Sequence, residues 1–208
     1  MSINLKLSWK LGIEFFTEWD YIIPVTICSY FFEASAMAID RVEFLSVLED
    51  SYSAYYNIIR DGIPSDYPLV FRADYFQRGE RFWLSKSIPI YGNETNEFCY
   101  VFSNDAFGLV DVRRCIDFAL EDGLPRVKPH KEHQYSNIKT VFVADSFSDE
   151  AVSEIRSRRF QKSYNHSFWG YSSLLTTAVD VAGQNVWVNR EGRDMKKYIK
   201  KLFSAQRA

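Results

Sequence analysis

The sequence predicts an α+β fold (mixed α/β), with a central mixed sheet led by a β-hairpin and flanked by helices. Residues 97–103 form a nearly continuous apolar and aromatic run, as expected of a central strand covered on both faces. Residues 138–145 form a second such run, and an amphipathic segment with a capping serine, 146–160, follows at once. A strand that leads directly into a helix predicts a layered sheet with helices packed on it.

Composition indicates one globular domain. The chain has 208 residues, of which 47% are hydrophobic and 25% charged, so it can bury a sizeable core. Its cysteines, Cys28, Cys99 and Cys115, are widely separated and have neither zinc-site spacing nor an even-numbered disulfide framework. We therefore expect reduced, buried thiols in a cytoplasmic protein.

Residues 1–37 differ from the rest and are predicted to be an N-terminal extension that the core does not need. Their uncharged run, 21–32, is shorter than the roughly 20 residues that span a bilayer. Acidic residues precede this run, which is atypical of a signal peptide, although Ala34-Ser-Ala36 resembles a cleavage site and keeps secretion open. We expect no membrane association and a single α+β domain over residues 38–208.

The first half of this domain is predicted to contain a helix and three strands. Residues 40–56 have apolar side chains at helical spacing after Asp40, a possible N-cap. Strands are expected at 69–76 and 81–87, joined by a turn at Arg78-Gly79, before the strand at 97–103.

The second half adds three helices and three strands. Residues 111–122 form a helix that Gly123 and Pro125 end, and Ser148 is placed to cap the helix after the 138–145 strand. The remaining elements are a hairpin, 174–181 with 185–189, and a final amphipathic helix, 193–203. The predicted order is α-β-β-β-α-β-α-β-β-α.

The charge is divided unevenly along the chain. Residues 1–125 contain 10 basic and 19 acidic residues, a net charge of −9, whereas residues 126–208 contain 15 and 8, a net charge of +7. An anionic partner could therefore bind through residues 126–208, and nucleic acid is the first such partner to consider. Alternatively, the two halves pack together and partly neutralise each other.

The loop that precedes the 138–145 strand is the most suggestive polar cluster. Arginine, lysine and histidine side chains can hold anions or transfer protons. Ligands often bind at the carboxyl ends of strands, so Asp145 could face this loop, or it could only bind backbone amides at the helix entry. The candidate polar site contains Arg126, Lys128, His130, Glu132, His133 and Asp145. A solvated connector without function is the alternative.

Asp74 and Glu97 are candidate metal ligands, because two convergent carboxylates and a lysine could hold Mg²⁺ for phosphodiester hydrolysis. The exposed face of a hairpin is the alternative. The sequence has no phosphate-binding glycine loop, dinucleotide fingerprint, nucleophile elbow or CxxC pair. No cofactor is evident, and Mg²⁺ is expected only if the protein is a nuclease.

Residues 115–130, continuing to Val141-Phe-Val-Ala-Asp-Ser-Phe147, resemble an uncharacterised family of small bacterial and archaeal proteins. The resemblance covers about residues 40–203. It implies a domain of unknown function and brings no activity with it.

The α-β-β-β-α-β succession, and the strand followed by Phe-Ser-Asp-Glu-Ala, are similar to the restriction-endonuclease-like (PD-(D/E)xK) core. This resemblance implies an acid on one hairpin strand, matched by Asp74, and an acid-x-Lys on the next. The chain departs from that pattern: Leu84-Ser85-Lys86 lacks the acid, and Glu97-Phe98-Cys99 lacks the lysine. The nuclease-like scaffold is a fold-level analogy.

We therefore expect a cytoplasmic, non-catalytic or regulatory binding protein on a nuclease-like scaffold. Two alternatives are a metal-dependent nuclease or other phosphoryl-transfer enzyme, and a protein-binding partner of the immunity type.

Overall fold

The computed structural model of the chain describes residues 40–62, 64–82 and 89–205. They belong to one unit, Ala38–Ala208. The predicted extension, 1–37, and the segment Leu84-Ser85-Lys86 lie outside the described residues.

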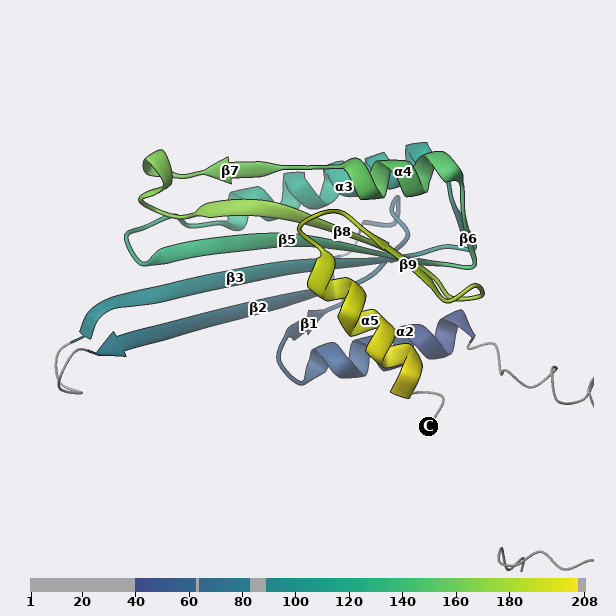
Figure 1. Cartoon of the computed structure of the whole chain (residues 1–208), viewed down its shortest axis with the longest axis horizontal. Helices are drawn as coiled ribbons and strands as arrows, with labels where there is room; N and C mark the ends of the chain where they lie inside the picture. The colour runs from purple at the N-terminus through teal and green to yellow at the C-terminus, as the bar shows by residue number, and fades with distance from the viewer. Residues whose placement is uncertain (1–39, 63, 83–88, 206–208) are drawn as a thin grey trace, which may run out of the picture. The chain divides into compact units, whose positions relative to one another are not determined.

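A mixed seven-stranded sheet forms the middle layer of this unit (Figure 1). Its order is β1-β2-β3-β5-β8-β7. Strand β9 pairs with residues 177–180 of β8, whereas β7 pairs with residues 171–173. Strands β3, β5 and β8 are parallel, whereas the other pairings are antiparallel. The strands are β1 (Asn57–Ile59), β2 (Leu69–Phe82), β3 (Pro89–Ser103), β5 (His133–Ala144), β7 (Gln161–Ser163), β8 (Tyr171–Asp180) and β9 (Asn185–Val188). The predicted α+β fold is confirmed.

Helices cover both faces of the sheet (Figure 1). Helices α3 and α4 pack on one face and α2 and α5 on the other, each pair over its own buried cluster. The helices are α2 (Arg41–Ser53), α3 (Leu109–Gly123), α4 (Asp149–Ser157) and α5 (Arg193–Ala205). The short elements are β4 (Ala106–Phe107), which pairs with β6 (Ser146–Phe147), and the 3₁₀ turns η1 (Leu124–Arg126) and η2 (Asn165–Ser167).

The helices form where apolar residues recur at helical spacing. Helix α3 buries residues at intervals of three and four, including Val112 and Ile116. Ser148 caps α4 as predicted, because its hydroxyl oxygen accepts a hydrogen bond of 3.2 Å from the Ala151 amide. Gly123 has a different role from the predicted one. It is the last residue of α3, and a Cβ there would lie 3.2 Å from the Tyr100 hydroxyl, so the glycine allows close packing on the sheet.

The predicted turn at Arg78-Gly79 is wrong. Strand β2 continues through it to Phe82, and Gly79 pairs with Asn93 of β3. Pairing along the neighbouring strand outweighs the low strand propensity of a single glycine. Strand β7 was also not predicted, because all three of its residues are exposed and polar or charged, without apolar alternation.

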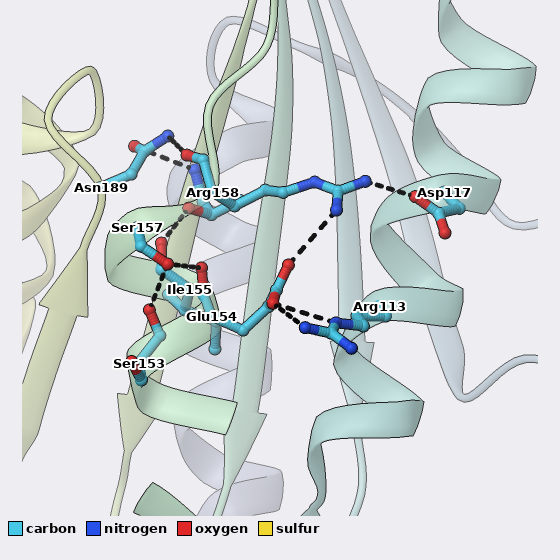
Figure 2. Close-up of polar contacts among 9 residues, drawn as sticks. Arg113, Asp117, Ser153, Glu154, Ile155, Ser157, Arg158 and Asn189 are labelled. Atoms are coloured by element: carbon cyan, nitrogen blue, oxygen red, sulfur yellow. Dashed lines mark hydrogen bonds and ion pairs between the residues drawn. The ribbon is translucent and has the colours of Figure 1, made fainter. Parts of the chain in front are cut away.

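A charged network joins α3 and α4 on the surface (Figure 2). Glu154 of α4 accepts hydrogen bonds from Arg113 at 2.9 and 3.0 Å and from Arg158 at 3.3 Å. Arg158 also donates to Asp117 of α3 at 2.6 Å. Beside this network, Asn189 donates to the Arg158 carbonyl at 3.2 Å, which ties the end of α4 to the segment after β9. These contacts hold α3 and α4 together.

Candidate functional site

The segment between α3 and β5 contributes Arg126 and Lys128 to a hollow of about 580 Å³, whose other lining residues belong to β1, β2 and β3. We call it the loop hollow. It lies on the sheet face that α3 covers, since Phe98 belongs to the α3-side cluster. Its lining residues are Asn57, Asp74, Tyr75, Phe76, Glu94, Asn96, Phe98, Arg126 and Lys128.

An ion pair between Arg126 and Asp74 organises the loop hollow. The Arg126 guanidinium donates to Asp74, lies 3.7 Å from an oxygen of Asp122, and stacks with its carbon 4.2 Å from the centre of the Phe98 ring. Burial is the largest single effect and lowers the pKa of Arg126, but the hydrogen bonds and charge interactions with Asp74 and Tyr100 together outweigh it, so the pKa lies above its ordinary value. Arg126 therefore remains charged.

Several polar atoms around this pair are buried without a hydrogen-bond partner among the described residues. They are Arg126 Nη1, Arg72 Nε and Asp74 Oδ1. A buried polar atom without a partner costs roughly 1–3 kcal/mol. Lys128 is exposed at the same hollow, and no ion pair is found for it in the described part of the chain. Lys128 is therefore the cation of the hollow that the protein leaves without an opposing charge among the described residues.

His130 and Glu132 do not line the hollow, although His130 contacts Glu94, which does. His130 Nδ1 accepts a hydrogen bond from the Glu132 amide at 3.2 Å, so its proton lies on Nε2, which faces Glu94 at 3.1 Å. The Glu132 carboxylate forms an ion pair with Arg78 at 2.7 Å.

His133 is buried and has a structural role. Its ring nitrogens lie 2.7 Å from the Trp169 carbonyl oxygen and 2.8 Å from the Ser136 hydroxyl. Both nitrogens are therefore occupied within the protein, and His133 does not face the hollow.

The prediction that Asp145 lies near this loop is wrong. Strand β5 begins at His133 and ends at Ala144, so Asp145 lies at the opposite end of a 12-residue strand, roughly 40 Å from the loop. There its carboxylate lies 3.7 Å from Arg41, and its amide donates to the Asp105 carbonyl at 3.2 Å. The prediction failed because the loop precedes β5 and Asp145 follows it, so the full length of the strand separates them.

Asp74 and Glu97 do not form the predicted pair of metal ligands, because they lie on opposite faces of the sheet. Asp74 pairs with Phe98 across β2 and β3, so these two side chains share a face, and the adjacent Glu97 points to the other face. No group of three or more His, Cys, Asp or Glu side chains suited to a metal ion occurs among the described residues.

Glu97 instead contributes to a second cavity, of about 470 Å³, that the sequence did not predict. We call it the tyrosine pocket. It lies on the face covered by α2 and α5, as Tyr52 and Met195 of its lining belong to that cluster. The lining residues are Ser51, Tyr52, Tyr55, Tyr56, Glu97, Tyr135, Asn137, Lys139, Leu175, Glu191, Asp194, Met195 and Tyr198.

The floor of the tyrosine pocket is an ion pair between Glu97 and Lys139, at 2.5 Å. The exposed fractions of these side chains are only 15% and 10%. Glu97 also accepts hydrogen bonds from the Tyr56 hydroxyl and, at 3.4 Å, from Asn137. Burial, and then the hydrogen bond to Glu97, raise the pKa of Tyr56 above its ordinary value, so the phenol stays protonated.

One signal in the sequence could have revealed this site. Lys139 is the one charged residue within the predicted strand 138–145 before Asp145 ends it, and a charge inside a central strand needs a buried partner. The sequence alone does not say which acid supplies it. The parallel pairing places Lys139 beside Cys99 of β3. Glu97 lies two residues before Cys99, so its side chain is on the same face as that of Lys139.

The charge asymmetry of the sequence is partly neutralised within the unit. Cations of residues 126–208 form ion pairs with acids of the first half, among them Arg126–Asp74, Arg126–Asp122, Lys139–Glu97 and Arg158–Asp117. Other cations of the second half are exposed on α5, on the face opposite α3. The basic residues therefore do not form one continuous surface.

The comparisons with known proteins agree with the family resemblance. Residues 40–201 match a family model described as a domain of unknown function (DUF8052). The chain belongs to this family. The DUF8052 match covers every helix and sheet strand described above except the end of α5, so both cavities lie inside the family domain. Searches of curated proteins and of solved structures find no match. In the described part of the DUF8052 chain, no helix has the length and apolar character needed to cross a membrane.

Proposed function

We propose that this DUF8052 protein is a non-catalytic binding protein that holds a small anionic molecule in the loop hollow. One observation carries the proposal: two cationic side chains, Arg126 and Lys128, line the same hollow, and no ion pair is found for Lys128 in the described ranges. A carboxylate or phosphate oxygen there would accept hydrogen bonds from these cations.

The carboxylates around the hollow do not oppose this ligand strongly, because each has a donor from the protein. Asp74 accepts from Arg126, and Glu94 accepts from Asn96 at 3.4 Å and faces His130 Nε2 at 3.1 Å. Asp122, which does not line the hollow, accepts from Arg72 at 3.2 Å and from the Tyr100 hydroxyl at 2.6 Å. An added anion therefore meets acids that are already neutralised or hydrogen-bonded.

The separation of Asp74 from Glu97 favours binding over metal-dependent hydrolysis. A metal ion that bridges a phosphodiester needs convergent oxygen ligands, and these two acids lie on opposite faces, each paired with its own cation. Our proposal therefore keeps a nuclease-like scaffold without a nuclease site.

We also propose that the protein is cytoplasmic and comes from a prokaryote. Cys99 and Cys115 are buried free thiols, which suits a reducing compartment. The antiparallel β2–β3 hairpin, followed by α3 and by β5 parallel to β3, supports the resemblance to the nuclease-like core.

The first test is a titration of ¹⁵N-labelled protein with inorganic phosphate, followed by NMR. We expect saturable shifts at the amides around Arg126 and Lys128. The Lys128→Ala variant should bind about fivefold more weakly, because it loses one exposed charge contact worth about 1 kcal/mol. Lys131→Ala, which removes an exposed lysine of the same loop that does not line the hollow, is the matched control. Equal losses in both variants would leave only a non-specific charge effect and contradict the proposal.

The second test is an incubation with short single- and double-stranded DNA and RNA in the presence of Mg²⁺ or Mn²⁺. We expect no cleavage above the buffer control. Cleavage that is lost in an Asp74→Ala or a Glu97→Ala variant would overturn the non-catalytic proposal in favour of the nuclease.

A further inference from the structure

The tyrosine pocket is independent of the proposed function. It lies on the opposite sheet face from the loop hollow and shares no lining residue with it. A cavity of this size with a few polar groups on its floor is the usual form of a small-molecule site.

Aromatic rings dominate the wall of this pocket, since five of its lining residues are tyrosines. Three of the hydroxyls have protein partners: Tyr56 donates to Glu97, Tyr198 donates to Ser51 at 2.5 Å, and Tyr52 lies 3.9 Å from the Met195 sulfur. Because these hydroxyls are held by the protein, the rings are fixed in place. The Lys139 ammonium lies 5.8 Å from the centre of the Tyr56 ring, so a ligand cation would use the other rings. The negative face of an aromatic ring attracts cations.

The charges that line the pocket have an acidic excess. Glu97, Glu191 and Asp194 face a single lysine, Lys139, which Glu97 already neutralises. Asp194 forms an ion pair with Lys197, at 3.3 Å, in which both side chains are largely exposed, and water screens such a pair strongly. The rim of the pocket therefore keeps negative charge that no lining cation offsets.

The tyrosine hydroxyls do not contribute to this negative charge. Burial and the charge of Glu97 raise the pKa of Tyr135 above its ordinary value, as they do for Tyr56, so both phenols stay neutral. A ligand in this pocket meets neutral aromatic rings together with carboxylates.

We propose that the tyrosine pocket binds an organic ammonium ion. Ring faces would surround the positively charged nitrogen and its methyl or methylene groups, while Glu191 and Asp194 supply the opposing charge at the rim. The remaining acceptor capacity of Glu97 would receive a hydroxyl or N–H group of the ligand.

The test uses two probes of the same shape that differ in charge: choline chloride and the neutral 3,3-dimethyl-1-butanol. The tyrosine ring signals of the full chain are followed by NMR, with sodium chloride as the salt control. We expect saturable binding of choline, with the neutral alcohol at least about tenfold weaker. Equal or tighter binding of the alcohol, or no binding of choline, would overturn the proposal.

Variants of single residues test whether choline binds in the tyrosine pocket. Glu191→Gln should weaken choline binding about threefold to fivefold, because it removes one exposed charge from the rim. Glu121→Gln changes an exposed acid of α3 away from the pocket and should bind like the wild type. Tyr55 is 78% exposed, so Tyr55→Leu should leave the fold intact and also weaken choline binding. A loss of affinity that is equal in the Glu121 and Glu191 variants would contradict binding in this pocket.

Phosphate binding at the loop hollow and choline binding at the tyrosine pocket are measured on different residues. Failure of one titration therefore leaves the other result unaffected.

Discussion

The two polar sites differ in how much water reaches their central ion pairs, although β3 contributes lining residues to both. In the loop hollow the exposed fractions of the Asp74 and Arg126 side chains are 22% and 29%, whereas those of Glu97 and Lys139 in the tyrosine pocket are 15% and 10%. The first pair lies on an open part of its face, and the second lies under residues of α2 and α5. Strand alternation therefore places adjacent positions of one strand in environments with different electrostatics.

The comparison predicts that removing a partner is most costly in the tyrosine pocket. Lys139→Met should reduce the free energy of unfolding by about 3–5 kcal/mol, because it leaves the Glu97 charge buried without its cation. Urea denaturation measures this loss.

Two controls accompany the Lys139 variant. Lys131→Met removes an exposed lysine and should change stability by less than about 0.5 kcal/mol. The double variant Glu97→Gln/Lys139→Met should regain part of the loss, since no unpaired charge remains. A double variant less stable than Lys139→Met would show that the ion pair is not the cause.

The second prediction concerns how the free energy of unfolding depends on pH through the two buried thiols, Cys99 and Cys115, which belong to the clusters on opposite faces of the sheet. Burial raises the pKa of Cys99 from 9.0 to about 11 and that of Cys115 from 9.0 to about 12. Between pH 9.0 and about 11 the unfolded Cys99 thiol loses its proton while the folded one keeps it. The stability contribution is therefore complete below pH 9.0 and decreases by up to about 1.4 kcal/mol per pH unit as the pH rises through this window.

Urea denaturation across this pH range measures the thiol effect, with Cys99→Ala as the comparison. The variant should show a shallower loss of stability with pH, although Cys115 still contributes with the same sign. An unchanged slope would mean that the folded Cys99 thiol ionises as readily as the unfolded one.

A smaller effect is expected in the loop hollow. Asp74→Asn should cost about 1 kcal/mol, because water screens this pair and asparagine keeps an oxygen that accepts from Arg126. Thermal or urea unfolding measures it, with the exposed Asp66→Asn as the matched control. A loss as large as that of Lys139→Met would remove the contrast between the two faces.

The smallest effect is expected for Lys128→Ala, which should change the free energy of unfolding by less than about 0.5 kcal/mol. Its side chain is exposed, and no ion pair is found for it in the described ranges. The same variant should still bind phosphate more weakly, so stability and binding separate at this position. A marked loss of stability would assign Lys128 a structural role.

Local patterns were sufficient to predict most of the elements. The apolar spacing in α3 and α5, the cap at Ser148 and the hairpin around Gly183 are all properties of short segments, and the structure contains them. Where the prediction failed, a neighbouring strand decided the outcome. Gly79 continues β2 because it pairs with β3.

The candidate site was predicted only in part, for a related reason. Arg126 and Lys128 lie close together in sequence and do meet at one hollow, together with Asp74. Asp145 follows the same loop in sequence, but the whole length of β5 separates it from that loop. Closeness in sequence therefore predicted correctly which residues of the loop meet, but it did not predict the position of a residue beyond the next strand.

The sequence by itself determined the α+β class, the helices and central strands, and the loop that carries Arg126 and Lys128. These depend on side-chain periodicity and on capping, which act within about a turn or a strand. Only the tertiary structure decided that Asp74 and Glu97 lie on opposite faces and that Lys139 is the partner of Glu97. Both facts depend on strand register, and a shift of one residue would exchange the faces of every side chain on the strand.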